Sequence, residues 1–115
     1  MTNKKTYLGE FEHLVLLSIH HLTTNAYGVT IRQHLKKTID REVSIGALYS
    51  TAERLEKKGY ISSKKGEAKA ERGGKAKRYF TLTAQGITSL AETKSKLELM
   101  WNTLPELSIS EGNYS

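Results

Sequence analysis

The chain has 115 residues, of which 37% are hydrophobic and 26% charged, and its formal net charge is +6. This length and composition suit one globular domain and argue against a disordered chain. The chain has no cysteine and its longest wholly apolar run is Leu14 to Leu17, which excludes disulfides, thiolate metal sites and a membrane span. Because no signal-peptide pattern follows the polar start, Met1 to Tyr7, we expect a cytoplasmic protein.

Two amphipathic helices are predicted in the first forty residues. The first covers Leu8 to Leu22, and the second runs from about Tyr27 to Ile39, after a polar break at Thr23 to Ala26. In both helices the apolar residues recur at steps of three or four, which places them on one face. Gly28 lowers the helix propensity of the second helix but permits close packing there. The residues that form the two faces are Leu8, Phe11, Val15, Ile19 and Leu22, then Tyr27, Ile31, Leu35 and Ile39.

A third helix is predicted to begin after Ser44, a good N-cap residue, and to end at Gly59, which suits the left-handed position that stops a helix. Lys57 and Lys58 suit its negative end. The face predicted to pack on the core carries Ile45, Leu48, Ala52 and Leu55. The opposite face carries Ala47, Ser50, Thr51 and Arg54. These mostly small side chains would let the helix approach another surface closely.

A hairpin is predicted next, because the apolar period changes from that of a helix to that of a strand. Tyr60 to Lys65 and Tyr79 to Thr83 form its strands, with Phe80 and Leu82 on one face of the second. A polar, basic loop that contains Gly66, Gly73 and Gly74 joins them and is expected to form a mobile tip.

The positive charge is concentrated in this part of the chain. Residues 54 to 78 hold ten basic and three acidic residues, a net charge of +7, whereas the rest holds eight basic and nine acidic residues. Such a patch is typical of a protein that binds a polyanion. Charge alone leaves open the alternative of a solvated, solubilising face.

A last helix is predicted from about Ala84 to Leu104, with Thr83 as its cap and Pro105 after its end. Leu90, Leu97 and Leu104 are seven residues apart, which gives a short heptad-like stripe. Ile87 and Trp101 fall on the alternate seam, and Lys94 interrupts it. The tail, Glu106 to Ser115, is expected to be frayed.

Three helices, a basic hairpin and a fourth helix are the elements of a winged helix-turn-helix, so we predict a mainly α (α+β) fold with a two-stranded β wing. Residues 1–83 would form the DNA-binding domain, 84–105 a C-terminal dimerisation helix and 106–115 a flexible tail. An exposed helix fits the major groove, where base pairs are distinguishable, and basic groups on the wing would contact phosphate.

Four segments resemble the PadR family of transcriptional regulators. "LGEFEHLVLLSI" and "AYGVTIRQHL" resemble the first two helices of that family, "VSIGALYSTAERLEKKGYI" its recognition helix and first wing strand, and "ERGGKAKRYFTLTAQG" the closing of the wing. The match runs from about Leu8 to Gly86. In the commonest form of the wing two prolines follow the paired glycines, and here Lys75 and Ala76 stand instead. The single helix after the wing is similar to the small PadR subgroup, in which it forms the dimer interface.

The candidate DNA contacts lie on the third helix and the wing. Some of them have another interpretation besides DNA contact. Ser44 can also serve as an N-cap, and Tyr49 is equally well interpreted as a packing residue. For Arg54, the alternative is a plain surface charge. In the wing, the resemblance makes Arg78 the strongest candidate, because the basic pair of the family falls at Lys77 and Arg78. The full set of DNA-binding candidates is Ser44, Ala47, Tyr49, Ser50, Arg54, Gly73, Gly74, Lys75, Lys77 and Arg78. The dimer-interface candidates are Leu8, Phe11, Leu90, Leu97, Trp101 and Leu104.

Trp101, the only tryptophan, is a candidate effector contact. Some small PadR-like regulators bind flat drugs between aromatic residues at the dimer centre, although a tryptophan at a helical seam is more often interface core. No metal, cofactor or catalytic site is predicted. His20 and His21 are adjacent and point in different directions on a helix, and we find no nucleophile arrangement and no phosphate-binding glycine loop.

The sequence therefore predicts a homodimeric regulator, most simply a repressor, that binds a near-palindromic operator in duplex DNA with one helix per half-site. The resemblance implies regulation of its own promoter and a neighbouring gene, and release by a small-molecule effector is a further option. The alternatives are a winged-helix protein-interaction module, which needs no basic wing, and an enzyme. An RNA-binding protein is another, but the aromatic sheet platform for stacked bases is missing.

Overall fold

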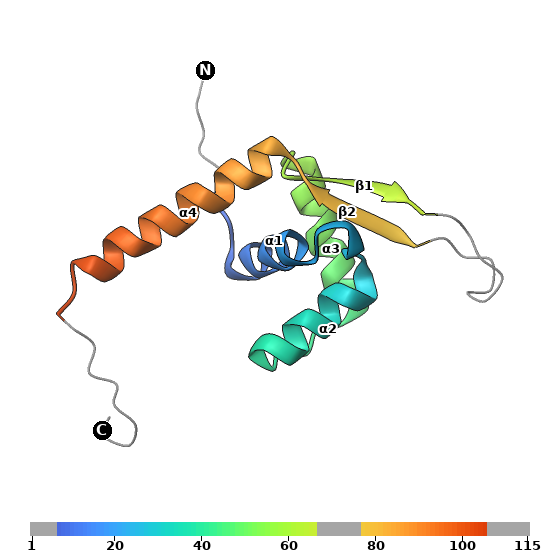
Figure 1. Cartoon of the computed structure of the whole chain (residues 1–115), viewed down its shortest axis with the longest axis horizontal. Helices are drawn as coiled ribbons and strands as arrows, with labels where there is room; N and C mark the ends of the chain where they lie inside the picture. Colours follow the sequence, from blue (N-terminus) through green and yellow to red (C-terminus); the bar gives the residue numbers. More distant parts are fainter. Residues whose placement is uncertain (1–6, 67–76, 106–115) are drawn as a thin grey trace.

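The computed structural model describes residues 7–66 and 77–105 and shows a helical body with a two-stranded hairpin on one side and a long helix on the other (Figure 1). The elements, in chain order, are α1 (Glu10–Leu22), the 3-10 turn η1 (Thr23–Asn25), α2 (Gly28–Ile39), α3 (Ile45–Lys57), β1 (Ile61–Lys65), β2 (Arg78–Leu82) and α4 (Ala84–Asn102). The predicted winged helix-turn-helix fold is confirmed. Among the described residues, no helix has the length and apolar character that crossing a membrane requires.

Helix α1 begins two residues later than predicted, at Glu10 rather than Leu8. The reason is a local cap: the backbone N–H of Gly9 donates to Glu12 Oε1 over 2.9 Å, which fixes Gly9 outside the helix. Leu8 therefore precedes the helix, where it packs, half-buried, against the hydrophobic core.

Both predicted ends of α3 are confirmed. Ser44 Oγ accepts a hydrogen bond from the N–H of Ala47 over 3.1 Å, and Gly59 has a φ of +82°, in the left-handed region that favours glycine. Two side-chain placements were wrong. Thr51, predicted on the outer face, is buried with 2% of its surface exposed, because it lies between Leu48 and Leu55 in the helical phase. Ile45, predicted in the core, is 44% exposed because it stands in the first turn, at the edge of the core.

The hairpin pairs β1 with β2 in antiparallel register, from Ile61 opposite Leu82 to Lys65 opposite Arg78. Its base is joined to the turn between α1 and α2: the N–H of Phe80 donates to the carbonyl of Ala26 over 2.8 Å, and Tyr27 and Tyr79 form an antiparallel bridge. The strands are thus bound to the helical body through backbone contacts.

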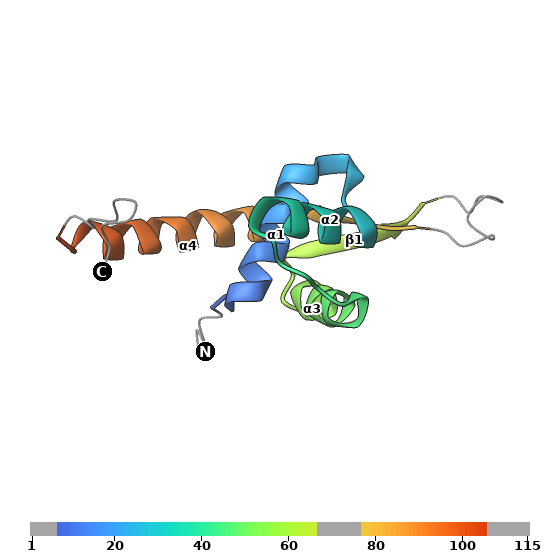
Figure 2. The same ribbon diagram turned by 90° about the horizontal axis from the view of Figure 1, so that it is seen from below.

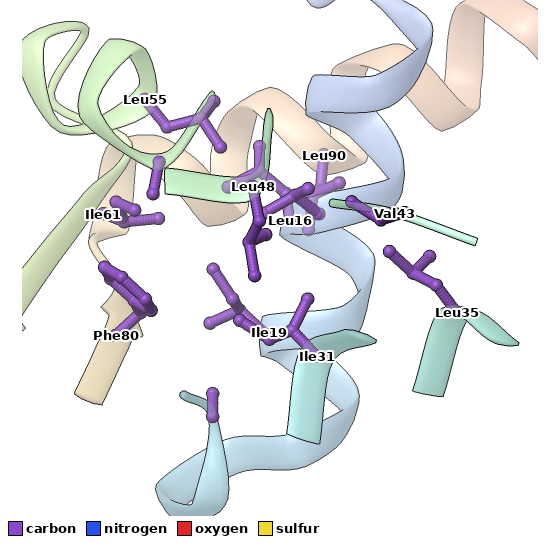
Figure 3. Packing of buried hydrophobic residues seen from close by; sticks show 13 residues of the cluster. Leu16, Ile19, Ile31, Leu35, Val43, Leu48, Leu55, Ile61, Phe80 and Leu90 are labelled. Carbon is purple, nitrogen blue, oxygen red and sulfur yellow. The ribbon is translucent and has the colours of Figure 1, made fainter. Parts of the chain in front are cut away.

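One hydrophobic core unites all four helices and the hairpin (Figure 3). Leu16 and Ile19 of α1, Leu48 of α3 and Phe80 of β2 are at most 2% exposed. Gly28 brings α2 close to α3, since a β-carbon at this position would lie 2.7 Å from the hydroxyl oxygen of Tyr49. The close packing predicted at Gly28 is confirmed.

Helix α4 starts on the core and then leaves it. Thr83 Oγ1 accepts from the N–H of Gly86 over 3.1 Å, as a cap should, and Leu90 is 9% exposed against the core. Beyond Leu90 the helix extends away from the body, on the side opposite to the wing strands (Figure 2). It ends at Asn102, two residues before the predicted Leu104.

Candidate nucleic-acid interface

The exposed face of α3 is lined by small side chains. Ser44, Ala47 and Ser50 are all exposed and are spaced three residues apart, so they follow one side of the helix from its N-terminal end. Figure 2 shows α3 on one side of the body, below the strands of the wing. A helix surface with such short side chains can enter a groove without steric obstruction.

Tyr49 is oriented into the protein. It is half-buried, its ring centroid lies 6.2 Å from that of Phe80, and its hydroxyl oxygen lies over Gly28. Of the two interpretations of Tyr49, packing residue or DNA contact, this geometry favours packing.

Arg54 is exposed but already has partners within the protein. Its Nη2 donates to Thr51 Oγ1 over 3.0 Å, and its Nε lies 3.5 Å from Glu12 Oε2. These contacts orient the guanidinium along α3 and leave part of it accessible to a ligand.

Glu12, on α1, is the centre of a buried charge cluster that also contains Lys58. Lys58 Nζ donates to both carboxylate oxygens of Glu12 over 2.9 Å. Burial acts to raise the pKa of Glu12, but the hydrogen bonds from Lys58 and from the N–H of Gly9, with the charge of Lys58, outweigh it and hold the pKa below its usual value. The cluster fixes α3 against α1.

Lys77 and Arg78, at the loop end of the hairpin strands, differ in their contacts. Arg78 Nη2 donates to Glu56 Oε1 over 2.7 Å, and Ser63 Oγ donates to the other oxygen of that carboxylate over 2.8 Å. Lys77 Nζ instead donates to the hydroxyl of Tyr27 over 3.0 Å and lies 4.2 Å from the centre of the Tyr27 ring. The predicted contacts Gly73, Gly74 and Lys75 lie outside the described residues.

The structure adds basic candidates that the sequence analysis missed, on α2 beside α3. Arg32, Lys36 and Lys37 line a shallow groove with Val43. Arg32 Nε donates to the carbonyl of Val43 over 2.7 Å, and Lys36 is paired with Asp40 and Glu42. In a helix-turn-helix protein the first helix of the motif crosses the phosphate backbone. The spacing of these basic residues on α2 could therefore have indicated phosphate contacts from the sequence.

A second surface feature is an apolar groove between α1 and α4, with a volume of about 520 Å³. Leu17 of α1 and Ile87, Leu97 and Trp101 of α4 line it, together with the buried Leu90. Leu97, Trp101 and Leu104 are each about half exposed, whereas Leu8 and Phe11 are half-buried against the core. No cluster of three or more metal-binding side chains occurs in residues 7–66 and 77–105.

One family model and a set of solved structures resemble the chain. The family model described as the transcriptional regulator PadR-like family matches residues 16–92. A PadR-like transcription factor from Bacteroides fragilis is 27% identical, with a TM-score of 0.71 over 81% of this chain and 84% of that one. A transcriptional regulator from Clostridium thermocellum is 26% identical, with a TM-score of 0.66 over 80% of this chain and 86% of that one.

A PadR family transcription regulator from Clostridium difficile shares the fold at 20% identity, with a TM-score of 0.69 over 83% of this chain and 94% of that one. A search of curated proteins found no match.

Proposed function

Because the chain belongs to the PadR-like family of transcriptional regulators, we propose that it is a homodimeric repressor that binds a near-palindromic operator in duplex DNA. The members of this family are regulators and not enzymes. Each protomer would place α3 in the major groove of one half-site and contact the adjacent backbone with the wing. Residues 1–83 would form the DNA-binding domain and 84–105 the dimerisation helix. The observation that carries the proposal is that α3, with its exposed face of small residues, contacts the wing through Glu56 and Arg78, in a segment of charge +7.

Dimerisation is supported by the outer half of α4. Leu97, Met100 and Trp101 on α4, and Leu104 just beyond its end, are between 48% and 68% exposed where the helix extends from the body. Contiguous apolar surface of this kind marks an interaction site in a water-soluble domain. A second copy related by a two-fold axis would cover it reciprocally with its own α4, and the two copies would enclose the groove between α1 and α4.

Binding of the protein to its own promoter tests the DNA-binding proposal. We expect fluorescence anisotropy to show tight binding to a promoter duplex and weaker binding to a scrambled duplex of equal length, with selectivity kept as salt rises. Equal and steeply salt-sensitive binding to both duplexes would indicate only a non-specific basic protein. No binding at low salt would favour the protein-interaction module. Reduced promoter output in a purified transcription assay would establish repression.

The groove between α1 and α4 is also a candidate binding site for a small-molecule effector. Its volume of about 520 Å³ is that of a drug-sized ligand site, and Trp101 on its wall offers a flat aromatic face. Trp101 is the only tryptophan, so a flat aromatic dye that enters the groove should quench the intrinsic fluorescence. Loss of dye binding in a Trp101→Ala variant that is still dimeric would support this role, and unchanged binding would exclude it.

A further inference from the structure

Strand alternation at the start of β2 sends Lys77 and Arg78, at the loop end of the hairpin, to opposite faces of the hairpin. Arg78 shares the face of Phe80 and reaches Glu56 on α3, whereas Lys77 shares the face of Tyr79 and reaches Tyr27 at the start of α2. Although Lys77 and Arg78 are adjacent in sequence, Lys77 contacts the start of α2 and Arg78 contacts α3.

Their electrostatic states differ as well. Arg78 is paired with a carboxylate at 2.7 Å, and the two side chains are only 39% and 30% exposed. Such a pair has no net charge, so it attracts phosphate weakly. Lys77 meets a neutral hydroxyl and an aromatic ring, which hold the ammonium in place. Within residues 7–66 and 77–105, no carboxylate pairs with it.

The carboxylate of Glu56 connects three elements. It lies in the last turns of α3 and accepts from Ser63 of β1 and from Arg78 of β2. Both strands of the wing are therefore bound to the helix that would enter the major groove, and this contact fixes the angle between wing and helix.

From this arrangement, and given the proposed DNA-binding function, we infer that Arg78 is a positioning residue that holds the wing against α3 through Glu56, while Lys77 carries the phosphate contact at the loop end of the strands. This assignment reverses the order of the two residues that the family resemblance favours.

Removing Glu56 distinguishes a positioning role of Arg78 from a direct phosphate contact, because the two roles predict opposite changes in promoter affinity. If Arg78 acts through Glu56, Glu56→Ala and Arg78→Gln each weaken promoter binding by about three- to tenfold, and the double variant is no weaker than either single variant. If Arg78 binds phosphate directly, Glu56→Ala releases the guanidinium and removes a negative charge, so binding becomes stronger.

The salt dependence gives a second readout. Lys77→Gln should reduce the slope of log K against log salt by about one for each half-site, whereas Arg78→Gln should leave the slope unchanged. A reduced slope for Arg78→Gln with an unchanged slope for Lys77→Gln would overturn the inference.

Hydrogen exchange of the DNA-free protein tests the positioning role even if the protein proves not to bind DNA. Glu56→Ala and Arg78→Gln should accelerate amide exchange in β1 and β2 to the same extent, and the double variant should add nothing. Lys65→Gln is the matched control, because Lys65 lies opposite Arg78 in the ladder but is exposed. Unchanged exchange in Glu56→Ala would refute the positioning role, whereas failure of wild-type promoter binding would refute the proposed function alone.

Discussion

Glu12 is an acidic side chain that is only 8% exposed, in a position where an uncompensated charge would strongly destabilise the fold. Lys58 and the N–H of Gly9 compensate it, and both belong to structural junctions, the first at the end of α3 and the second at the start of α1. Removing the charge of Glu12 leaves Lys58 without its partner.

We therefore expect Glu12→Gln to lower the free energy of unfolding at neutral pH by about 2 kcal/mol. The matched control is Glu10→Gln in the same turn, because Glu10 pairs with Arg41 on the surface and is 78% exposed. Its loss should change stability by less than about 0.5 kcal/mol. Urea unfolding of the three proteins provides the comparison, and equal stability of both variants would contradict the role given to Glu12.

The lowered pKa of Glu12 also predicts how its contribution changes with pH. A carboxyl group with a depressed folded-state pKa stabilises the fold above its unfolded value, near 4.5, and loses this effect as the pH falls through the folded value. The stability difference between wild type and Glu12→Gln should be largest at pH 7 and shrink below pH 4.5. A difference that stays constant down to pH 3 would show that the charge is not its origin.

His34 predicts a pH effect in a different range. Burial, followed by the nearby charges of His21 and Lys37, lowers its pKa below the usual 6.5, and its ring is stacked on that of His21 with centroids 4.3 Å apart. A lowered histidine pKa means that the unfolded chain binds the proton more readily, so stability is full above pH 6.5 and decreases below it. Thermal unfolding between pH 8 and pH 5 should show a smaller decrease for His34→Gln than for wild type, and equal decreases would argue against this role.

At the scale of the elements, α4 is fixed to the body at its first turn. A β-carbon at Gly86 would collide with the carbonyl oxygen of Tyr60, whereas a β-carbon at Gly46, in the first turn of α3, would meet nothing within 4 Å. Replacement of glycine by alanine should therefore change the free energy of unfolding in opposite directions at the starts of α4 and α3.

We expect Gly86→Ala to lower the free energy of unfolding by about 1–3 kcal/mol through steric overlap. Gly46→Ala should raise it by about 0.5–1 kcal/mol through better helix propensity. Chemical denaturation of both variants measures the difference, and two changes of the same sign would mean that the contact at Tyr60 relaxes without cost.

The elements that the sequence predicted well are those defined by short-range chemistry. Ser44 and Gly59 delimit α3 because a cap hydrogen bond and a left-handed residue act within a few positions. Thr51 was misplaced because its hydroxyl was treated as a solvent-facing group, whereas in the structure it accepts from Arg54 at the buried edge of the helix.

The contacts between elements were beyond the reach of the sequence. Glu56 and Arg78 are 22 residues apart, and Glu12 and Lys58 are 46 apart. No local period or propensity relates such residues, because their proximity depends on how the helices and the hairpin pack. For the same reason the sequence could place Arg54 and Arg78 in the candidate interface but could not give their acidic partners, Glu12 and Glu56.

At the scale of the whole molecule, the outer half of α4 predicts the oligomeric state. Leu97→Lys introduces a charge into the groove between α1 and α4, which a partner could not cover without desolvating it. We expect wild type to be dimeric and this variant to be monomeric at micromolar concentration in sedimentation velocity, with weaker promoter binding. Ser95→Lys, an exposed position on α4 outside the groove, should remain dimeric, and a dimeric Leu97→Lys would place the interface elsewhere.

The attachment of the wing at both faces has a consequence for control. Glu56 joins the wing to α3 and Tyr27 joins it to α2, so in the proposed dimer the wing and the helix-turn-helix of each protomer would move together as one unit. If the proposed effector binds in the groove between α1 and α4, it would release DNA by changing the distance between the two recognition helices, with each DNA-binding unit unaltered, until that distance no longer equals one helical turn of the duplex.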